Sequence, residues 1–204
     1  MQKFGKVNEI TKIEEVYHSK FLKLFEIYYK TKLGNNKKWM VASRKNIEDY
    51  KKMLFKEEEF KNDAVLIAAM DVEKEALVLI REFRMPINDY IYSLPAGLID
   101  SGEDMYESAI REVYEETGLE LYEIDRENSC KKSFASVGMS DEAIALVYGK
   151  VRGNFSTSSQ EESEIIEPIY VDRKMAEKIL ESGENIDIKA WIILKDFVRR
   201  GSIF

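Results

Sequence analysis

The sequence has almost none of the residues that build disulfides, zinc sites or thiol–imidazole pairs. Its 204 residues include one cysteine, Cys130, and one histidine, His18. A single cysteine excludes an intramolecular disulfide, which suits a reducing cytoplasm. Because Cys130 and His18 lie far apart in the sequence, they do not indicate a catalytic pair, and we interpret Cys130 as structural. The scarcity of thiolate and imidazole also disfavours zinc.

Long apolar runs and an excess of basic residues are missing as well. No run of about 18 apolar residues is present, so we expect no membrane span. The N-terminal stretch MQKFGKVNEITKIEE has no apolar segment of the kind found in signal peptides. A formal charge of −7 does not indicate a basic surface that would bind nucleic acid or an anionic membrane. We therefore expect a cytoplasmic protein that binds neither.

The N-terminal part of the chain has the pattern of a β-hairpin. A hydrophobic content of 45% and a charged content of 34% are those of an ordinary globular protein. Aromatic and β-branched residues at 21–31 and 38–43 flank the turn Gly34-Asn35-Asn36, which favours a hairpin. Residues 46–61 show a loose helical pattern.

Beyond residue 60, short apolar runs alternate with amphipathic segments. Strands are predicted at 64–70, 76–83, 90–94, 131–136, 142–151 and 167–171, and helices at about 104–117, 173–181 and 188–200. We expect Ser101 to cap the first helix, with Asp104 completing a capping box, and Gly118 to end it. This order of elements favours an α+β fold over a regular βαβ array.

The most informative stretch is GLIDSGEDMYESAIREVYEETGL, residues 97–119. On a helix, Glu112, Glu115 and Glu116 share one arc, away from an apolar arc that can pack on a sheet. The apolar arc consists of Tyr106, Ala109, Ile110 and Val113. Carboxylates at this spacing repel each other, and a divalent cation removes the conflict.

The alternative is a solvated acidic helix face, which three glutamates alone would usually form. Gly97 and Gly102 weigh against it, because they flank a loop in which backbone can approach a ligand closely. Arg111 could also orient a neighbouring carboxylate through a bidentate contact. Oxygen ligands without thiolate or imidazole favour Mg²⁺, which keeps water and phosphate oxygens as its other ligands.

The same stretch resembles the Nudix box, G-x5-E-x7-R-E-U-x-E-E-x-G-U, where U is a bulky aliphatic residue. The matching positions are Gly97, Glu103, Arg111, Glu112, Val113, Glu115, Glu116, Gly118 and Leu119. The resemblance implies a Nudix α/β/α sandwich with a mixed sheet, preceded by a small N-terminal antiparallel β-sheet. It also implies hydrolysis of a nucleoside diphosphate linked to another group, with Mg²⁺, or alternatively Mn²⁺, as cofactor.

The family pattern assigns a role to each charged residue of the box. Glu112 and Glu116 would be the main metal ligands, and Glu115 would stand close behind them in the catalytic machinery. Arg111 would orient these glutamates. Glu103 would support the junction between loop and helix.

The flanking sequence is similar to the ADP-ribose pyrophosphatase branch of the family. In LPAGLID, residues 94–100, the Ala96 carbonyl would bind metal and Leu98 would lie at the substrate. Arg84 in REFRMP would contact a substrate phosphate. Glu142 in SVGMSDE, residues 136–142, would lie near the substrate ribose.

The loop QEESEIIEPIYV, residues 160–171, resembles an acidic loop of that branch. It would supply the catalytic base, Glu162, and a further metal ligand, Glu164. Glu161 is the nearest alternative for the base, and Glu142 is another.

The resemblance divides the chain into an N-terminal β-sheet and dimerisation region, 1–60, and a Nudix catalytic domain, 61–204. In the branch, two subunits exchange this small sheet, and its aromatic side chains hold the adenine. The candidates here are Tyr28, Tyr29 and Trp39. For any single one of them, a core or dimer-interface role is the favoured alternative.

The chain departs from the branch at three places. Ser93 stands where the branch usually carries Glu, Val137 replaces a proline, and residues 46–61 form a longer connection. Ser93 and Val137 do not affect the expected catalytic chemistry, but they make the choice of substrate less specific.

We therefore expect a homodimeric hydrolase that converts ADP-ribose, or a related nucleoside diphosphate sugar, to AMP and a sugar phosphate. The alternatives are a Nudix hydrolase of another nucleoside diphosphate compound or a dinucleotide, and a non-catalytic regulator that binds ADP-ribose. An acidic interaction protein with a fortuitous box is a more remote reading.

Overall fold

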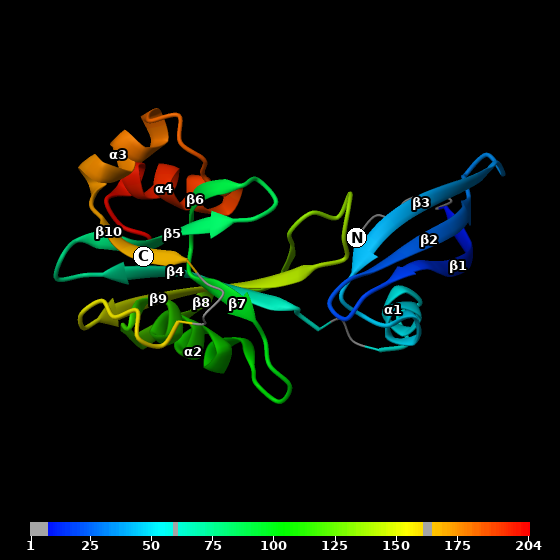
Figure 1. Ribbon diagram of the computed structural model, residues 1–204, viewed down its shortest axis with the longest axis horizontal. Coiled ribbons are helices and arrows are strands. Elements are labelled where there is room, and N and C mark those ends of the chain that lie inside the picture. Colours follow the sequence, from blue (N-terminus) through cyan, green and yellow to red (C-terminus); the bar gives the residue numbers. More distant parts are fainter. Residues whose placement is uncertain (1–7, 59–60, 161–164) are drawn as a thin grey trace. The chain divides into compact units, whose positions relative to one another are not determined.

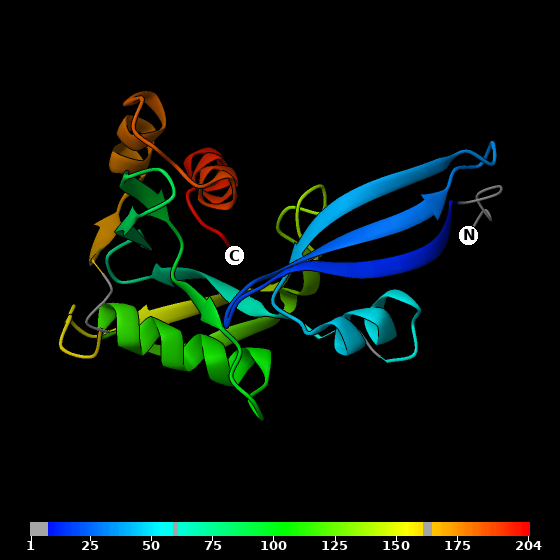
Figure 2. The ribbon, with the colours of Figure 1, turned by 45° about the vertical axis from the view of Figure 1, so that its right-hand side comes forward.

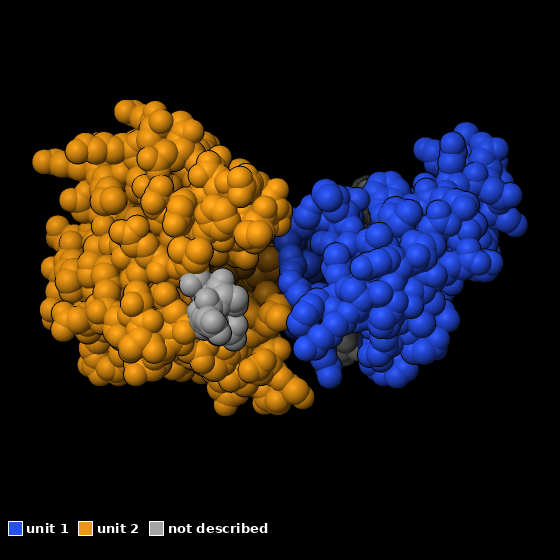
Figure 3. Space-filling view, in the orientation of Figure 1, with its two compact units in different colours: residues 1–63, 134–143 blue, residues 64–133, 144–204 orange. Residues whose placement is uncertain are grey.

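The computed structural model describes residues 8–58, 61–160 and 165–204. The chain forms two compact units (Figure 3). Residues 1–63 and 134–143 make up the first unit, and residues 64–133 and 144–204 make up the second. A loop between two strands of the second unit thus belongs to the first. In the described residues, no helix is both long enough and apolar enough to cross a bilayer.

The first unit is a three-stranded antiparallel sheet with one helix (Figure 1). Its elements are β1 (Glu9–His18), β2 (Lys23–Lys30), β3 (Asn36–Ser43) and α1 (Ile47–Leu54). The helix and one face of the sheet enclose a small core, in which the rings of Phe25 and Tyr50 stack with centroids 4.8 Å apart. The expected hairpin is β2 and β3. Seven of the ten residues of β1 are exposed, so the strand carries little apolar signal.

The second unit is built on a mixed seven-stranded sheet. The order of its main path is β10-β5-β4-β9-β8, and β6 and β7 pair with β5 and β4. The strands are β4 (Ala64–Asp71), β5 (Ala76–Arg84), β6 (Asp89–Ser93), β7 (Ala96–Leu98), β8 (Glu120–Phe134), β9 (Ala143–Arg152) and β10 (Ile166–Val171). Strand β4 runs parallel to β9 and antiparallel to β5 and β7.

Helices cover both faces of this sheet (Figures 1 and 2). Helix α2 (Met105–Thr117) lies on one face, and α3 (Arg173–Glu181) and α4 (Ile188–Arg200) lie on the other. Strand β4 is accordingly buried along almost its whole length. This α/β/α arrangement, with the small sheet that precedes it, confirms the predicted fold.

Helix α2 begins later than expected. Asp104, rather than Ser101, is the N-cap residue. Its side chain accepts from the backbone N–H groups of Tyr106 and Glu107, and the Glu107 side chain accepts from the Asp104 N–H. Both S-x-x-D and D-x-x-E fit the pattern of a capping box, and the second one forms. The helix ends as predicted at Gly118, which has a left-handed φ of 76°.

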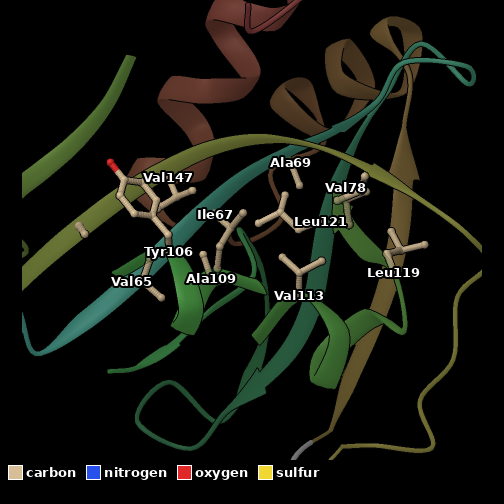
Figure 4. Close-up of a cluster of buried hydrophobic side chains, with 12 residues drawn as sticks. Val65, Ile67, Ala69, Val78, Tyr106, Ala109, Val113, Leu119, Leu121 and Val147 are labelled. Carbon is tan, nitrogen blue, oxygen red and sulfur yellow. The ribbon is translucent and has the colours of Figure 1, made fainter. Parts of the chain in front are cut away.

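Packing against the sheet decides which residues of α2 are buried. Tyr106, Ala109 and Val113 point into a core with side chains of β4, β5, β8 and β9 (Figure 4). Ile110 lies outside this stripe and is 45% exposed, whereas Glu116 is only 4% exposed. The expected separation of apolar and acidic arcs is therefore wrong at these two positions. The buried stripe continues through Glu116 because it advances by three or four residues at a time.

Two strands of the second unit differ from the expectation. Strand β7, centred on Gly97, was expected to be loop. Strand β8 starts at Glu120 instead of 131, since most of its side chains are exposed and it carries little apolar signal. The predicted strands 142–151 and 167–171 and the last two helices agree with β9, β10, α3 and α4 within one residue.

Candidate active site

Helix α2 packs beside strand β7, and this places Glu112 and Glu116 next to the backbone of β7. The Ala96 N–H donates to Oε2 of Glu116 at 3.1 Å. At the next position, a Cβ atom on Gly97 would lie 2.0 Å from the carboxyl carbon of Glu112. Any side chain at position 97 would displace the Glu112 carboxylate, so the glycine at the first position of the box lets this carboxylate lie against the backbone.

Arg111 holds the exposed side of the same cluster. Its Nη1 donates to Oε1 of Glu112 at 2.7 Å and to Oε2 of Glu115 at 3.0 Å. Its Nη2 donates to the Leu98 carbonyl oxygen at 3.0 Å. One guanidinium therefore links two carboxylates of α2 to strand β7.

Glu103 binds the edge of the Arg111 guanidinium that carries Nε and Nη2. Its oxygens accept from Nε of Arg111 at 3.0 and 3.3 Å and from Nη2 at 2.9 Å. The Ser108 hydroxyl donates to the same carboxylate at 2.7 Å. Hydrogen bonds from Arg111 and then from Ser108 lower the pKa of Glu103 to about 2, and Glu103 in turn raises the pKa of Arg111. Both groups stay charged across the physiological range.

Arg111 and the carboxylates of α2 line a cavity of about 360 Å³. Its walls are formed by Ala96, Gly97, Leu98, Asp100, Arg111, Glu112, Glu115, Glu116 and Ser159. Four carboxylates face one guanidinium, so the cavity carries an excess of negative charge. All of the donors are oxygen atoms, which suits a hard divalent cation and not zinc.

The carboxylates do not form a ready metal cage. Within residues 8–58, 61–160 and 165–204, no three His, Cys, Asp or Glu side chains are grouped so that they could hold an ion. Glu112 and Glu115 are turned toward Arg111 instead. The proposed base Glu162, its alternative Glu161 and the proposed ligand Glu164 lie outside the described residues.

Arg84 is on the same face of the sheet as α2 but is not one of the residues that line the cavity. It lies at the end of β5, its side chain is 55% exposed, and its Nε is 3.0 Å from Oε2 of Glu82. Glu82 and Ser108 were not singled out from the sequence. For Glu82 a signal existed, because a charged residue interrupts the apolar run ALVLIREF.

The other sequence-predicted residues belong to the first unit. Glu142 forms an ion pair with Arg44 at 3.5 Å and lines a small pocket of about 150 Å³ in this unit. The Tyr28 hydroxyl donates to Glu26 at 2.8 Å, and the Lys38 ammonium lies 4.6 Å from the centre of the Tyr28 ring.

Tyr28 and Trp39 lie on opposite faces of the small sheet. Tyr28 is paired with Lys38 and Trp39 with Ile27, and side chains of successive residues alternate between faces. Within one sheet they cannot stack on the same base. Tyr29 is on the face of Trp39, because it is two residues along from Ile27.

Comparison with known proteins agrees with this geometry. The family model described as "NUDIX domain" matches residues 60–192, which is more than half of the chain. "Putative nudix hydrolase 2" of Caenorhabditis elegans is 32% identical over 144 residues, 69% of this chain and 59% of that protein. "ADP-ribose pyrophosphatase" of Bacillus subtilis is 28% identical over 127 residues, 62% of this chain and 66% of that protein. The chain thus spans less than two thirds of each relative.

A solved structure described as "Crystal structure of ADP compounds hydrolase" has the same fold. The two chains superimpose with a TM-score of 0.71 over 97% of each, at 19% sequence identity.

Proposed function

The chain belongs to the Nudix family, and on that premise we propose that it hydrolyses the pyrophosphate bond of ADP-ribose or a related nucleoside diphosphate sugar. The products are AMP and a sugar phosphate. The observation that carries the proposal is the cavity in which four carboxylates face one guanidinium. The name of the Bacillus subtilis relative supports ADP-ribose as the first substrate to test.

The acidic cavity fits a divalent cation, Mg²⁺ or alternatively Mn²⁺. We assign the ligands to the Ala96 carbonyl, Glu112, Glu116 and Glu164. When bound, such an ion shields the charge of the pyrophosphate and makes a bound water more acidic. Glu116 is suited to hold it because the Ala96 N–H already fixes its carboxylate, and Glu112 is suited because its carboxylate lies against Gly97.

The remaining residues position the substrate and move a proton. Arg111 holds Glu115 and Glu112 in place, and Glu103 keeps Arg111 from turning away. A water oxygen attacks one phosphorus atom, and the P–O bond to the bridging oxygen breaks. Glu162 accepts the proton of that water, with Glu161 and Glu142 as alternatives.

The substrate contacts that we propose are those assigned from the sequence. Arg84 binds a phosphate oxygen, Leu98 lies against the substrate, and Glu142 accepts from a ribose hydroxyl. Tyr28 or Trp39 stacks on adenine, and since they are on opposite sheet faces, each would act alone. We further propose a homodimer formed through residues 1–60 and a cytoplasmic location.

A substrate panel tests this function. ADP-ribose, other nucleoside diphosphate sugars and dinucleotides are incubated with and without Mg²⁺, and the released nucleoside monophosphate is measured. We expect Mg²⁺-dependent release of AMP from ADP-ribose. Faster hydrolysis of another compound would move the assignment to that substrate. Binding of ADP-ribose with no hydrolysis of any compound would identify a regulator.

Glu116→Gln is the matched variant for this panel. The amide keeps the size of the side chain and removes its charge, so the fold should be retained. We expect turnover to fall at least about a hundredfold, which corresponds to about 2.7 kcal/mol of activation free energy. Near-normal turnover of Glu116→Gln at saturating Mg²⁺ would rule out the role assigned to this carboxylate.

A further inference from the structure

Strand β5 carries a buried carboxylate that the mechanism above does not use. Glu82 is 7% exposed, although it lies in the main sheet among apolar residues. A carboxylate withdrawn from water in this way is costly unless its oxygens are paired. The groups that pair with the Glu82 oxygens therefore indicate its role.

Each carboxylate oxygen of Glu82 has its own partner. The Ser93 hydroxyl donates to Oε1 at 2.6 Å. Nε of Arg84 lies 3.0 Å from Oε2. Arg84 has no other ion-pair partner among the residues that the structure describes. The contact through Nε leaves the terminal N–H groups of an arginine, which is 55% exposed, to a ligand.

The register of the strands puts these three side chains on one face of the sheet. β5 and β6 pair without a bulge, with Ile80 opposite Ser93. Because side chains alternate, Glu82, Arg84 and Ser93 share the face of Val78. Val78 packs in the core under α2. The group thus lies on the sheet face that carries the acidic helix.

We propose that Glu82 is a positioning residue, which orients the Arg84 guanidinium toward a phosphate group of the substrate. The inference rests on the proposed function, since it names the residue that prepares the phosphate contact. A guanidinium that is already held in an ion pair loses less freedom when it binds a phosphate. Ser93 is in β6, two residues before Pro95, and ties the same carboxylate to the segment that leads to Ala96.

The arrangement also accounts for the serine at position 93. A glutamate there, as in the related branch, would set a second carboxylate against Glu82 and the two would repel. Serine supplies a hydroxyl donor instead. The departure from the branch pattern and the buried carboxylate are therefore parts of one arrangement.

Steady-state kinetics of Glu82→Gln, with ADP-ribose and saturating Mg²⁺, test the proposal. We expect KM to rise about tenfold and kcat to change less than about threefold, because phosphate binding is weakened while the carboxylates of α2 are untouched. Arg84→Met should raise KM at least as much. The double variant should be no worse than Arg84→Met, since Glu82 acts through Arg84. Arg81→Met is the matched control, because this arginine lies on the other face of β5 over the Tyr90 ring and should leave KM unchanged.

Three results would overturn the proposal. One is an unchanged KM in Glu82→Gln. Another is a double variant in which the two effects on KM multiply, since Glu82 would then act independently of Arg84. If Glu82→Gln does not fold, Ser93→Ala is measured in its place. We expect its KM to rise about threefold, because Glu82 loses a hydrogen bond. An unchanged KM in Ser93→Ala would be the third contradicting result.

Failure of the proposed function would give a different pattern. If the wild-type protein hydrolyses no nucleoside diphosphate, binding of inorganic pyrophosphate with Mg²⁺ is measured by calorimetry for the same variants. Weaker binding by Glu82→Gln would uphold the positioning role without the hydrolase activity. Equal binding by the variant and the wild type would overturn it.

Discussion

Two clusters in this protein each set one basic side chain among several carboxylates, and they are built differently. In the first unit, Lys45 lies 2.7 Å from Asp63 and 3.1 Å from Asp141, the latter an ion pair without hydrogen-bond alignment. All three side chains are at most 17% exposed. In the second unit, Arg111 meets Glu103, Glu112 and Glu115, with side chains up to 41% exposed.

We interpret the first cluster as a structural ion pair and the second as the proposed binding site. The Lys45 cluster is nearly buried and borders a small pocket of about 150 Å³. Asp63 also accepts from the Ala143 N–H at 2.9 Å, so the cluster fastens loop 134–143 to the rest of the first unit. The Arg111 cluster opens into a cavity and has more carboxylates than one guanidinium can neutralise. We expect the first to contribute to stability and the second to activity.

Of the changes that distinguish the two clusters, Arg111→Met should have the largest effect on activity. Glu112 and Glu115 would lose the group that orients them, and we expect turnover to fall about a hundredfold. The free energy of unfolding should change by only about 1 kcal/mol, because these ion pairs are partly exposed. Kinetics and urea unfolding check both numbers. A variant that is unstable yet fully active when folded would reverse the assignment of this cluster.

Lys45→Met should have the largest effect on stability. Two nearly buried carboxylates would lose their cation, which costs about 3 kcal/mol of unfolding free energy. Urea unfolding measures it, with Lys52→Met as control, since Lys52 and Glu58 pair on the surface with side chains 45% and 55% exposed. The two variants should differ by at least about 2 kcal/mol. Equal stability of both would show that the buried cluster does not hold the first unit together.

Gly97→Ala should produce an intermediate loss by a steric route. Its Cβ would overlap the Glu112 carboxyl group, which is the end of a flexible side chain and can move aside. We therefore expect about 1 kcal/mol of destabilisation at most, and at least about tenfold lower turnover because the carboxylate is displaced. In a Glu112→Ala background the same change should cost little stability, because the clashing group is gone. Thermal unfolding of the four proteins in this cycle tests the contact. If the stability losses of Gly97→Ala and Glu112→Ala were additive, the loss in Gly97→Ala would not come from its contact with Glu112.

The smallest effect concerns pH. Arg111 lowers the pKa of Glu103 to about 2 in the folded protein, below its value in the unfolded chain. The contribution of Glu103 to stability is therefore complete above about pH 5 and disappears as the pH falls toward 2. The stability difference between the wild type and Glu103→Gln should shrink over this interval. A difference that stays constant from pH 7 to pH 2 would show that the Glu103 pKa is not lowered.

Local patterns predicted most of the fold. Helices α3 and α4 were placed correctly because both are periodic and capped, and the Nudix box located the carboxylates of α2. Packing could not be inferred in the same way. Ser101 and Asp104 offered two overlapping caps, and nothing local to Glu116 says that the buried stripe runs through it.

Contacts between distant residues were also beyond reach from the sequence. The pairing of Asp63 with the Ala143 backbone joins segments 80 residues apart. The Ser93–Glu82 bond depends on the register of β5 with β6. Local periodicity carries information on neither. The base assigned to Glu162 remains a prediction.

The central claim is that the carboxylates of α2 hold a divalent cation at the backbone of β7. Anomalous diffraction from a crystal soaked in Mn²⁺ with a non-hydrolysable ADP-ribose analogue tests it directly. The account predicts a peak at coordination distance, about 2.0–2.2 Å, from carboxylate oxygens of Glu112 and Glu116. Well-ordered analogue and side chains with no peak between them would contradict it.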